Sequence, residues 1–148
     1  MHQRLNPAAI SPAGYQAQLG LQSYVNESGI EKPLLELVKL RASQINGCAY
    51  CIAMHATEAA RDGESQARLY LLPAWRETAL YTPRERAALA WAEALTLVAD
   101  SRVPDEVYQE ARRQFSEKEL VDLAFAVIAI NGWNRLAVAF RLQPESGG

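Results

Sequence analysis

The residues most able to do chemistry are two cysteines and a histidine in one short segment. Cys48 and Cys51 form a Cys-x-x-Cys pair, and His55 follows the second cysteine by four residues. On a helix these spacings place all three side chains along one stripe, because residues three and four positions apart are neighbours. Gly47, directly before the pair, allows a tight entry into the helix, so the pair is expected in its first turn. The free N–H groups and positive dipole end of a first turn stabilise a thiolate.

A thiolate in this position is suited to redox chemistry. Thiolates attack peroxides and disulfides, a neighbouring imidazole accepts the thiol proton at neutral pH, and a second thiol condenses with a sulfenic acid to form a disulfide. Glu36, on the helix expected before the Asn46-Gly47 turn, could face the same stripe. A carboxylate there would orient His55 or relay protons through water. The pattern therefore predicts a nucleophile, its resolving thiol, a base and a relay carboxylate.

Two other interpretations compete with this one. The cysteines could be inert buried thiols, although the glycine, the place at a helix start and the histidine favour reactivity. They could also bind zinc together with His55 and Glu36. Three ligands on one helical turn fit tetrahedral geometry poorly, no second Cys-x-x-Cys exists, and the other histidine is His2 near the N-terminus. We therefore expect no metal, and the lack of a dinucleotide, P-loop or haem motif predicts no other cofactor.

The composition is that of one globular domain. The protein has 148 residues, of which 49% are hydrophobic and 22% charged, with a net charge of −2. A domain of this length buries enough apolar surface to fold without disulfides or structural metal ions. The net charge is close to zero and the sequence has no cluster of Lys and Arg, which argues against nucleic-acid binding. The longest uninterrupted apolar run, 123–130, is shorter than the about 20 residues of a membrane span. Since the N-terminus also lacks a signal sequence, we expect a cytoplasmic protein that binds neither nucleic acid nor membrane.

Proline, glycine and capping residues divide the chain at helix-sized intervals, and β-branched residues are sparse. The sequence thus predicts an all-α fold of about six to eight helices. We expect a single domain over 1–148, with an irregular arm at 1–10 and an irregular tail at 143–148. The expected helices cover residues 12–28, 33–46, 48–61, 64–72, 83–100, 104–115 and 117–142.

The last expected helix is apolar almost all round from Leu120 to Ile130. Such a helix must be buried on every side, and in so small a domain a subunit contact would cover the spare face. The sequence therefore predicts a homo-oligomer. Asn131 and Asn134 interrupt this helix and need partners. We expect them to cap the Asn46-Gly47 turn or to form hydrogen bonds across a subunit contact.

The segment ELVKLRASQINGCAYCIAMH, from Glu36 to His55, resembles the core motif of AhpD-like alkylhydroperoxidases in the carboxymuconolactone decarboxylase superfamily. That motif has a Glu twelve residues before the first Cys of Cys-x-x-Cys-x-x-x-His, and all four positions match in type and spacing. The similarity continues through residues 75–77 and 82–87 to 130–135, so it covers nearly the whole chain.

The resemblance implies an all-helical homo-oligomer, commonly a trimer or a hexamer built from trimers. It implies a thiol-dependent peroxidase that reduces alkyl hydroperoxides without metal or flavin and is itself reduced by a dithiol protein. By this resemblance, Cys51 of this chain would be the peroxidatic thiolate, Cys48 the resolving thiol, His55 the base and Glu36 the proton-relay carboxylate. Tyr50 stands where the best-known member has a relay histidine. The helix dipole alone would favour Cys48 as the nucleophile, whereas the nearby imidazole favours Cys51.

Two further functions share parts of this pattern. One is the sister activity, decarboxylation of a lactone acid, although those relatives generally do not rely on a cysteine pair. The other is a non-enzymatic redox sensor that uses the same thiols as a switch. A sensor would react slowly and stoichiometrically, whereas a peroxidase would turn over.

Overall fold

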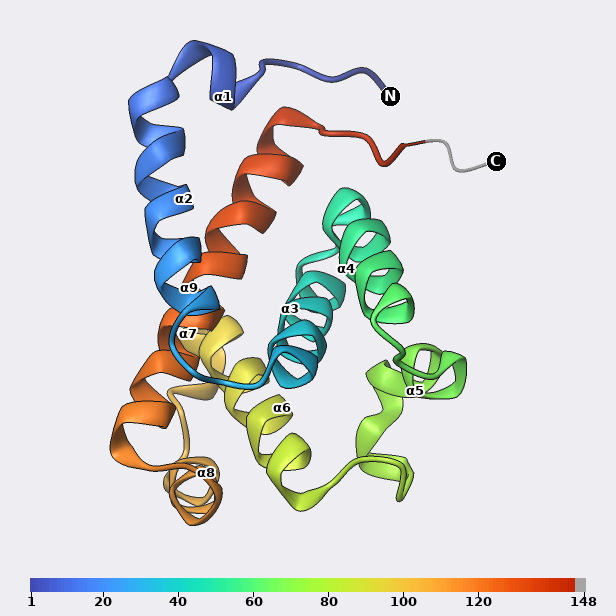
Figure 1. The fold of residues 1–148 in the computed structure, drawn as a ribbon, viewed down its shortest axis with the longest axis vertical. Coiled ribbons are helices and arrows are strands. Elements are labelled where there is room, and N and C mark those ends of the chain that lie inside the picture. Colours follow the sequence, from blue (N-terminus) through green and yellow to red (C-terminus); the bar gives the residue numbers. More distant parts are fainter. Residues whose placement is uncertain (146–148) are drawn as a thin grey trace.

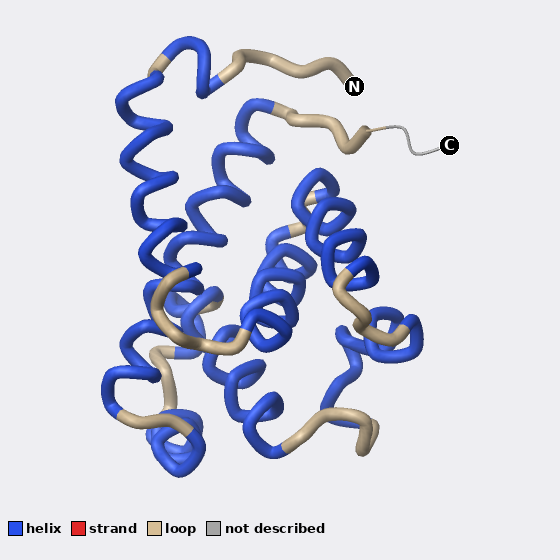
Figure 2. Tube along the Cα trace, in the orientation of Figure 1, coloured by secondary structure: helices blue, strands red, loops and turns tan. Residues whose placement is uncertain are grey.

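The computed structural model describes residues 1–145, and these residues form helices and no strand (Figure 2). The elements are α1 (Pro7–Ile10), α2 (Pro12–Asn26), α3 (Lys32–Asn46), α4 (Ala49–Arg61), α5 (Gln66–Leu71), the 3-10 helix η1 (Leu72–Glu77), α6 (Pro83–Thr96), α7 (Val98–Ser101), α8 (Asp105–Gln114) and α9 (Glu117–Phe140). The predicted all-α class is confirmed. Most helix ends lie within about two residues of the expected positions, which is the uncertainty of any helix boundary.

The expected number of six to eight helices is wrong, because the described residues contain nine α-helices. One extra helix, α1, lies in the arm that was expected to be irregular over 1–10. Pro7 occupies its first turn, and the Asn6 side chain accepts hydrogen bonds from the N–H groups of Ala8 and Ala9. The expected tail is non-helical at 142–145, and 146–148 lie outside the described residues.

The other extra helix arises from a break in the helix expected over 83–100. The helix stops at Thr96, and Leu97 has a non-helical ψ of 36° before α7 begins. The Ser101 hydroxyl donates to the carbonyl oxygen of Ala94 at 2.6 Å. In a continuous helix a backbone N–H would donate to this carbonyl oxygen, and here the Ser101 side chain donates to it. The hydrophobic pattern alone does not predict this bond.

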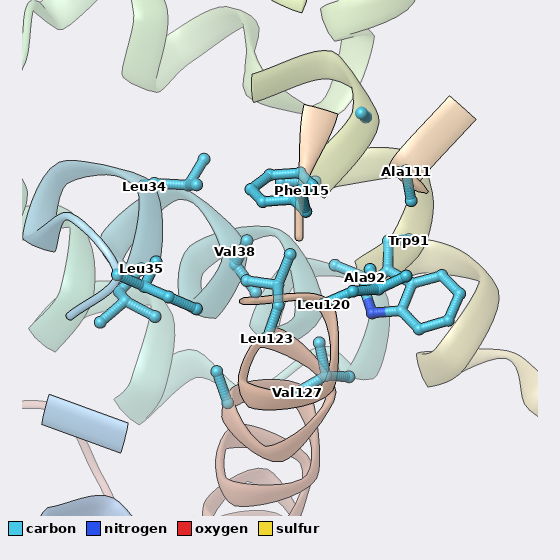
Figure 3. Close-up of a cluster of buried hydrophobic side chains, with 14 of the residues drawn as sticks. Leu34, Leu35, Val38, Trp91, Ala92, Ala111, Phe115, Leu120, Leu123 and Val127 are labelled. Carbon is cyan, nitrogen blue, oxygen red and sulfur yellow. The ribbon is translucent and has the colours of Figure 1, made fainter. Parts of the chain in front are cut away.

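Helix α3 is the centre of the domain, and it packs against α4, α6 and α9 (Figure 1). Helix α2 covers α9 on the side away from α4. Figure 3 shows the main apolar cluster, where side chains of α3, α6 and α9 such as Val38, Trp91 and Leu123 meet. Because α3 is buried on several sides, two of its charged residues, Glu36 and Lys39, lie inside the protein. Buried charges need partners, and those partners belong to the candidate site.

Both termini lie at one end of the molecule, where α4 begins and α9 ends (Figure 1). The N-terminal arm crosses the end of α9, where the Arg4 N–H donates to the carbonyl oxygen of Phe140 at 2.8 Å. The arm thereby covers the region between α2, α4 and α9. This arrangement places part of the arm on the same cavity as Cys51, although the two are distant in sequence.

Helix α9 is buried on most sides but not on all. A stripe of Val121, Phe125 and Ile128 remains exposed, with 55% of Val121 and Ile128 accessible to solvent. By length and composition α9 would also suit a membrane span, a test that core helices pass as well. The complete burial expected from the sequence is therefore not reached within a single chain. The stripe is the surface where the predicted subunit contact is best tested.

Ile128→Glu is expected to dissociate the predicted homo-oligomer, because a carboxylate buried in an apolar contact loses its hydration. Light scattering should show the wild type at a multiple of the 16.4 kDa chain mass and the variant at that mass. Leu80→Glu, at another exposed apolar side chain, is the control and should keep the wild-type mass. A wild type that scatters as a single chain at micromolar concentration would contradict the prediction.

Candidate active site

The turn between α3 and α4 positions the cysteine pair. Helix α3 ends at Gly47, which has a left-handed φ of 66°, and the N–H of Cys48 donates to the carbonyl oxygen of Ser43 at 3.0 Å. Cys48 is the N-cap of α4, and its Sγ accepts a hydrogen bond from the N–H of Cys51 at 3.2 Å. The expectation that the pair occupies the first turn is confirmed. Glycine suits this turn because other residues are strained at positive φ.

A disulfide joins Cys48 and Cys51. Both residues are 1% exposed and pack against Ala137 of α9, with Tyr50 and Leu142 at the edge of the cluster. Tyr50 thus packs beside the cysteines. The disulfide shows that the two sulfur atoms can bond to one another within the folded helix start. The pair is therefore geometrically able to cycle between dithiol and disulfide.

His55 lies one turn after Cys51 and between two carboxylates. Its Nδ1 is 3.6 Å from Oε2 of Glu36 on α3 and 3.6 Å from Oε2 of Glu58 on α4. Glu36 is 3% exposed and His55 is 6% exposed. The structure therefore brings Glu36 back to the cysteine stripe, beside the histidine. Since Nδ1 faces the carboxylates, Nε2 is the ring nitrogen available to a group in the neighbouring space.

Glu36 is ionised despite its burial. Removal from water raises its pKa, but the neighbouring His55 and the Lys39 ammonium outweigh that effect and hold the pKa of Glu36 below its ordinary value. The Lys39 Nζ lies 3.6 Å from Oε1 of Glu36. The carboxylate therefore carries a negative charge at neutral pH, and it can accept the Nδ1 proton of His55.

A cavity of about 560 Å³ opens beside this cluster. Of the two cysteines, Cys51 lines it. The walls come from the N-terminal arm, α2, α3, α4 and α9, and include Tyr15, Leu19, Lys39, Tyr50, Met54, His55, Glu58, Trp133 and Leu136. Volumes of this size are typical of small-molecule sites. A molecule in the cavity would meet Cys51 and His55 together.

A second, smaller cavity of about 170 Å³ lies on the other side of Glu36. Lys32, Asp62 and Glu64 line it together with Glu36. Glu36 thus separates the histidine from a polar space near the protein surface. A carboxylate in that position is suitably placed to pass protons between His55 and solvent.

The comparisons with known proteins identify the family of this chain. A model of the carboxymuconolactone decarboxylase family matches residues 12–94. The chain belongs to this family. The match includes Glu36, both cysteines and His55, so the candidate site lies within the family region. The predicted AhpD-like membership of the superfamily is thereby confirmed.

Relatives of this carboxymuconolactone decarboxylase family member share its whole length. The uncharacterized protein YdfG of Bacillus subtilis is 42% identical over 139 residues, which is 94% of this chain and 95% of that protein. A solved structure from Agrobacterium tumefaciens, ATU0492, has a TM-score of 0.96 and 43% identity, covering 99% of this chain and 100% of that chain. It was solved as a protein of unknown function, with antioxidant defence protein AhpD suggested as its identity.

The AhpD-like fold extends to more distant proteins. A peroxidase-related protein from Ralstonia eutropha with an alkylhydroperoxidase AhpD core has a TM-score of 0.82 at 20% identity, covering 94% of this chain and 74% of that chain. At this identity the likeness shows the shared fold alone.

Two residues of the AhpD-like site, Glu58 and Lys39, escaped the sequence interpretation. Glu58 follows His55 by three positions and Lys39 follows Glu36 by three, so each pair shares one helix face. That spacing was a usable signal. The proximity of the two pairs was not, because it depends on how α3 packs against α4.

Proposed function

We propose that this protein is a thiol-dependent peroxidase that reduces organic hydroperoxides through Cys48 and Cys51. The observation that carries the proposal is the position of Cys51, which is bonded to Cys48 at a helix start, lines the large cavity and precedes His55 by one turn. The AhpD identity suggested for the Agrobacterium tumefaciens protein is consistent with this activity.

In the proposed first step, the reduced enzyme forms a thiolate at Cys51. Nε2 of His55 accepts the thiol proton. The sulfur then attacks the terminal oxygen of the hydroperoxide, and the O–O bond breaks. An alkoxide leaves and takes a proton from the imidazolium to become an alcohol. Cys51 is oxidised to a sulfenic acid, and the peroxide is reduced by two electrons.

In the second step, the Cys48 sulfur attacks the sulfenic sulfur of Cys51. The S–O bond breaks, the departing hydroxide and the Cys48 proton form water, and the disulfide closes. A dithiol protein then reduces the disulfide by thiol–disulfide exchange and becomes oxidised itself. This need for a dithiol reductant fits a cytoplasmic location, where thiols are kept reduced.

Glu36 has a positioning role in this cycle. Its carboxylate faces Nδ1, and a hydrogen bond from the Nδ1 proton during catalysis would fix the tautomer that leaves Nε2 free as a base. The distance of 3.6 Å to Nδ1 is longer than a hydrogen bond. Catalytic contacts often shorten when the site becomes charged, and an imidazolium would attract Glu36 more strongly than the neutral ring. The smaller cavity then offers Glu36 exchange of protons with solvent.

The cavity walls favour an apolar substrate. Tyr15, Leu19, Trp133 and Leu136 line the space that leads to Cys51. Burial of an alkyl or aryl group against these side chains contributes roughly 25 cal/mol per Å² of apolar surface. Hydrogen peroxide has no apolar surface to bury. We therefore propose that organic hydroperoxides react faster than hydrogen peroxide.

Intact mass spectrometry of the fully reduced protein tests the activity. Brief exposure to one equivalent of cumene hydroperoxide is expected to remove two hydrogen atoms, the mass change of the Cys48–Cys51 disulfide. Repeated addition of peroxide with a dithiol should then give many turnovers. An unchanged mass after minutes would contradict the proposal and favour the lactone decarboxylase. One slow oxidation without turnover would instead indicate a redox sensor.

A further inference from the structure

The cluster around His55 has a property that the peroxidase cycle does not use. Ligand atoms of Glu36, His55 and Glu58 all lie within 4.8 Å of one another. Two of these atoms, Oε2 of Glu36 and Nδ1 of His55, are fully buried and have no hydrogen-bond partner among the described residues. Buried polar atoms are nearly always paired in folded proteins. Two unpaired atoms that face one shared space therefore indicate a missing partner between them.

The distances in the cluster fit a metal ion in that space. Nδ1 of His55 is 3.6 Å from the Oε2 atoms of both Glu36 and Glu58. Zinc binds imidazole nitrogen and carboxylate oxygen at about 2.1 Å, so two ligands of a tetrahedral ion lie about 3.4 Å apart. The two measured separations need to close by only a few tenths of an ångström. The side chain of Glu58 is 43% exposed, so it has the freedom to complete this movement.

The donor set and its surroundings also suit a divalent cation. One imidazole nitrogen and two carboxylate oxygens are ligands that zinc accepts, and a three-ligand site leaves a fourth position open. That position would face the large cavity, which His55 and Glu58 both line. Lys39 contacts Oε1 of Glu36, so the other oxygen remains free for the ion. Carboxylate ligands are commonly held in this way by an outer partner, although the positive charge of Lys39 weakens cation binding.

We propose that Glu36, His55 and Glu58 form a binding site for a divalent cation of the zinc class. A cation bound at Nδ1 displaces the proton from that nitrogen. The neutral ring has a single N–H proton, which then resides on Nε2, so this nitrogen cannot accept the proton of Cys51. Zinc is therefore expected to inhibit peroxide reduction reversibly. This inhibition rests on the proposed peroxidase function, whereas the binding itself does not.

Titration calorimetry of zinc into the oxidised protein tests the binding directly, because the disulfide removes both thiols as ligands. The wild type is expected to bind about one zinc ion per chain. Glu58→Gln removes one anionic ligand and should weaken binding at least tenfold. Lys39→Met removes the opposing charge and should tighten it severalfold. Glu106→Gln, which makes the same charge change on exposed α8 surface, should bind like the wild type.

Imidazole ¹⁵N spectra give a second readout that identifies the ligand atom. Zinc should shift the Nδ1 signal of His55 and leave that of His2 unchanged. Equal affinities of the wild type and Glu58→Gln, each folded by circular dichroism, would overturn the proposal. So would loss of binding in His2→Gln, which would place the ion on the N-terminal arm. Zinc binding that does not inhibit peroxide reduction would support the cation site but contradict the role of His55 as the base.

Discussion

Replacing Cys51 by Ser is expected to lower the rate of organic hydroperoxide reduction by about a thousandfold or more. The Ser hydroxyl has the same place on α4 but is not ionised at neutral pH, so the nucleophile is lost. Stopped-flow measurement of peroxide consumption by the reduced variant tests this result. Cys51→Ser cannot form the buried disulfide. The circular dichroism spectra of the reduced wild type and of this variant should therefore first be shown to match.

Cys48→Ser is the matched control, and it should behave differently. Its first reaction with peroxide is expected to proceed near the wild-type rate, because Cys51 and His55 are unchanged. Without a resolving thiol the sulfenic acid then persists, and the intact mass should increase by that of one oxygen atom. Turnover should cease. A fast first reaction in Cys51→Ser, with a slow one in Cys48→Ser, would reverse the proposed roles of the two sulfur atoms.

The helix dipole, which favours a thiolate at Cys48, and the His55 imidazole, which favours one at Cys51, can act in different steps of the cycle. The backbone N–H that donates to Cys48 Sγ stabilises negative charge on that sulfur. A stabilised thiolate is also the better leaving group in thiol–disulfide exchange. Attack by the reductant on Cys51, the cysteine that lines the cavity, would release Cys48 as that thiolate. The dipole argument for Cys48 and the imidazole argument for Cys51 then describe different steps of one cycle.

Local signals in the sequence were sufficient for most of the helices. Thr82 and Ser116 each cap a helix with Glu three residues later, and both capping boxes form in the structure. Gly47 ends α3 in the left-handed conformation, which brings Cys48 to the start of α4. Such features depend on a few adjacent residues. The sequence therefore predicted the position of the cysteine pair on its helix.

Features that depend on packing between helices were not predictable in this way. The cavity draws its walls from several distant parts of the chain, including the N-terminal arm. The burial of Lys39 follows from the central place of α3, and nothing in its immediate neighbours indicates it. The exposed stripe on α9 arises because α2, α3 and α6 cover the other faces of that helix. Each of these features requires the tertiary arrangement, which periodicity along one helix does not contain.

For the two asparagines of α9, the sequence indicated that their side chains need hydrogen-bond partners, and the packing of the helices supplies them. The sequence suggested that Asn131 and Asn134 either cap the Asn46-Gly47 turn or bond across a subunit contact, and the structure places both beside the Asn46 side chain. The Asn46 side-chain amide donates to Oδ1 of Asn131 at 3.0 Å and to Oδ1 of Asn134 at 2.9 Å. Asn134 also donates to the Ser43 hydroxyl at 3.0 Å. These bonds fasten the end of α3 to α9 directly before the cysteine pair.

Asn134→Ala is accordingly expected to destabilise the oxidised protein by about 2–4 kcal/mol. It removes one buried and one partly buried hydrogen bond, deprives the Ser43 hydroxyl of a donor and leaves a small void at a residue that is 1% exposed. Urea unfolding at fixed protein concentration measures the change. Asn26→Ala, the same change at an exposed position, is the control and should cost less than about 1 kcal/mol. Equal losses in the two variants would mean that burial of Asn134 adds nothing to the attachment of α3.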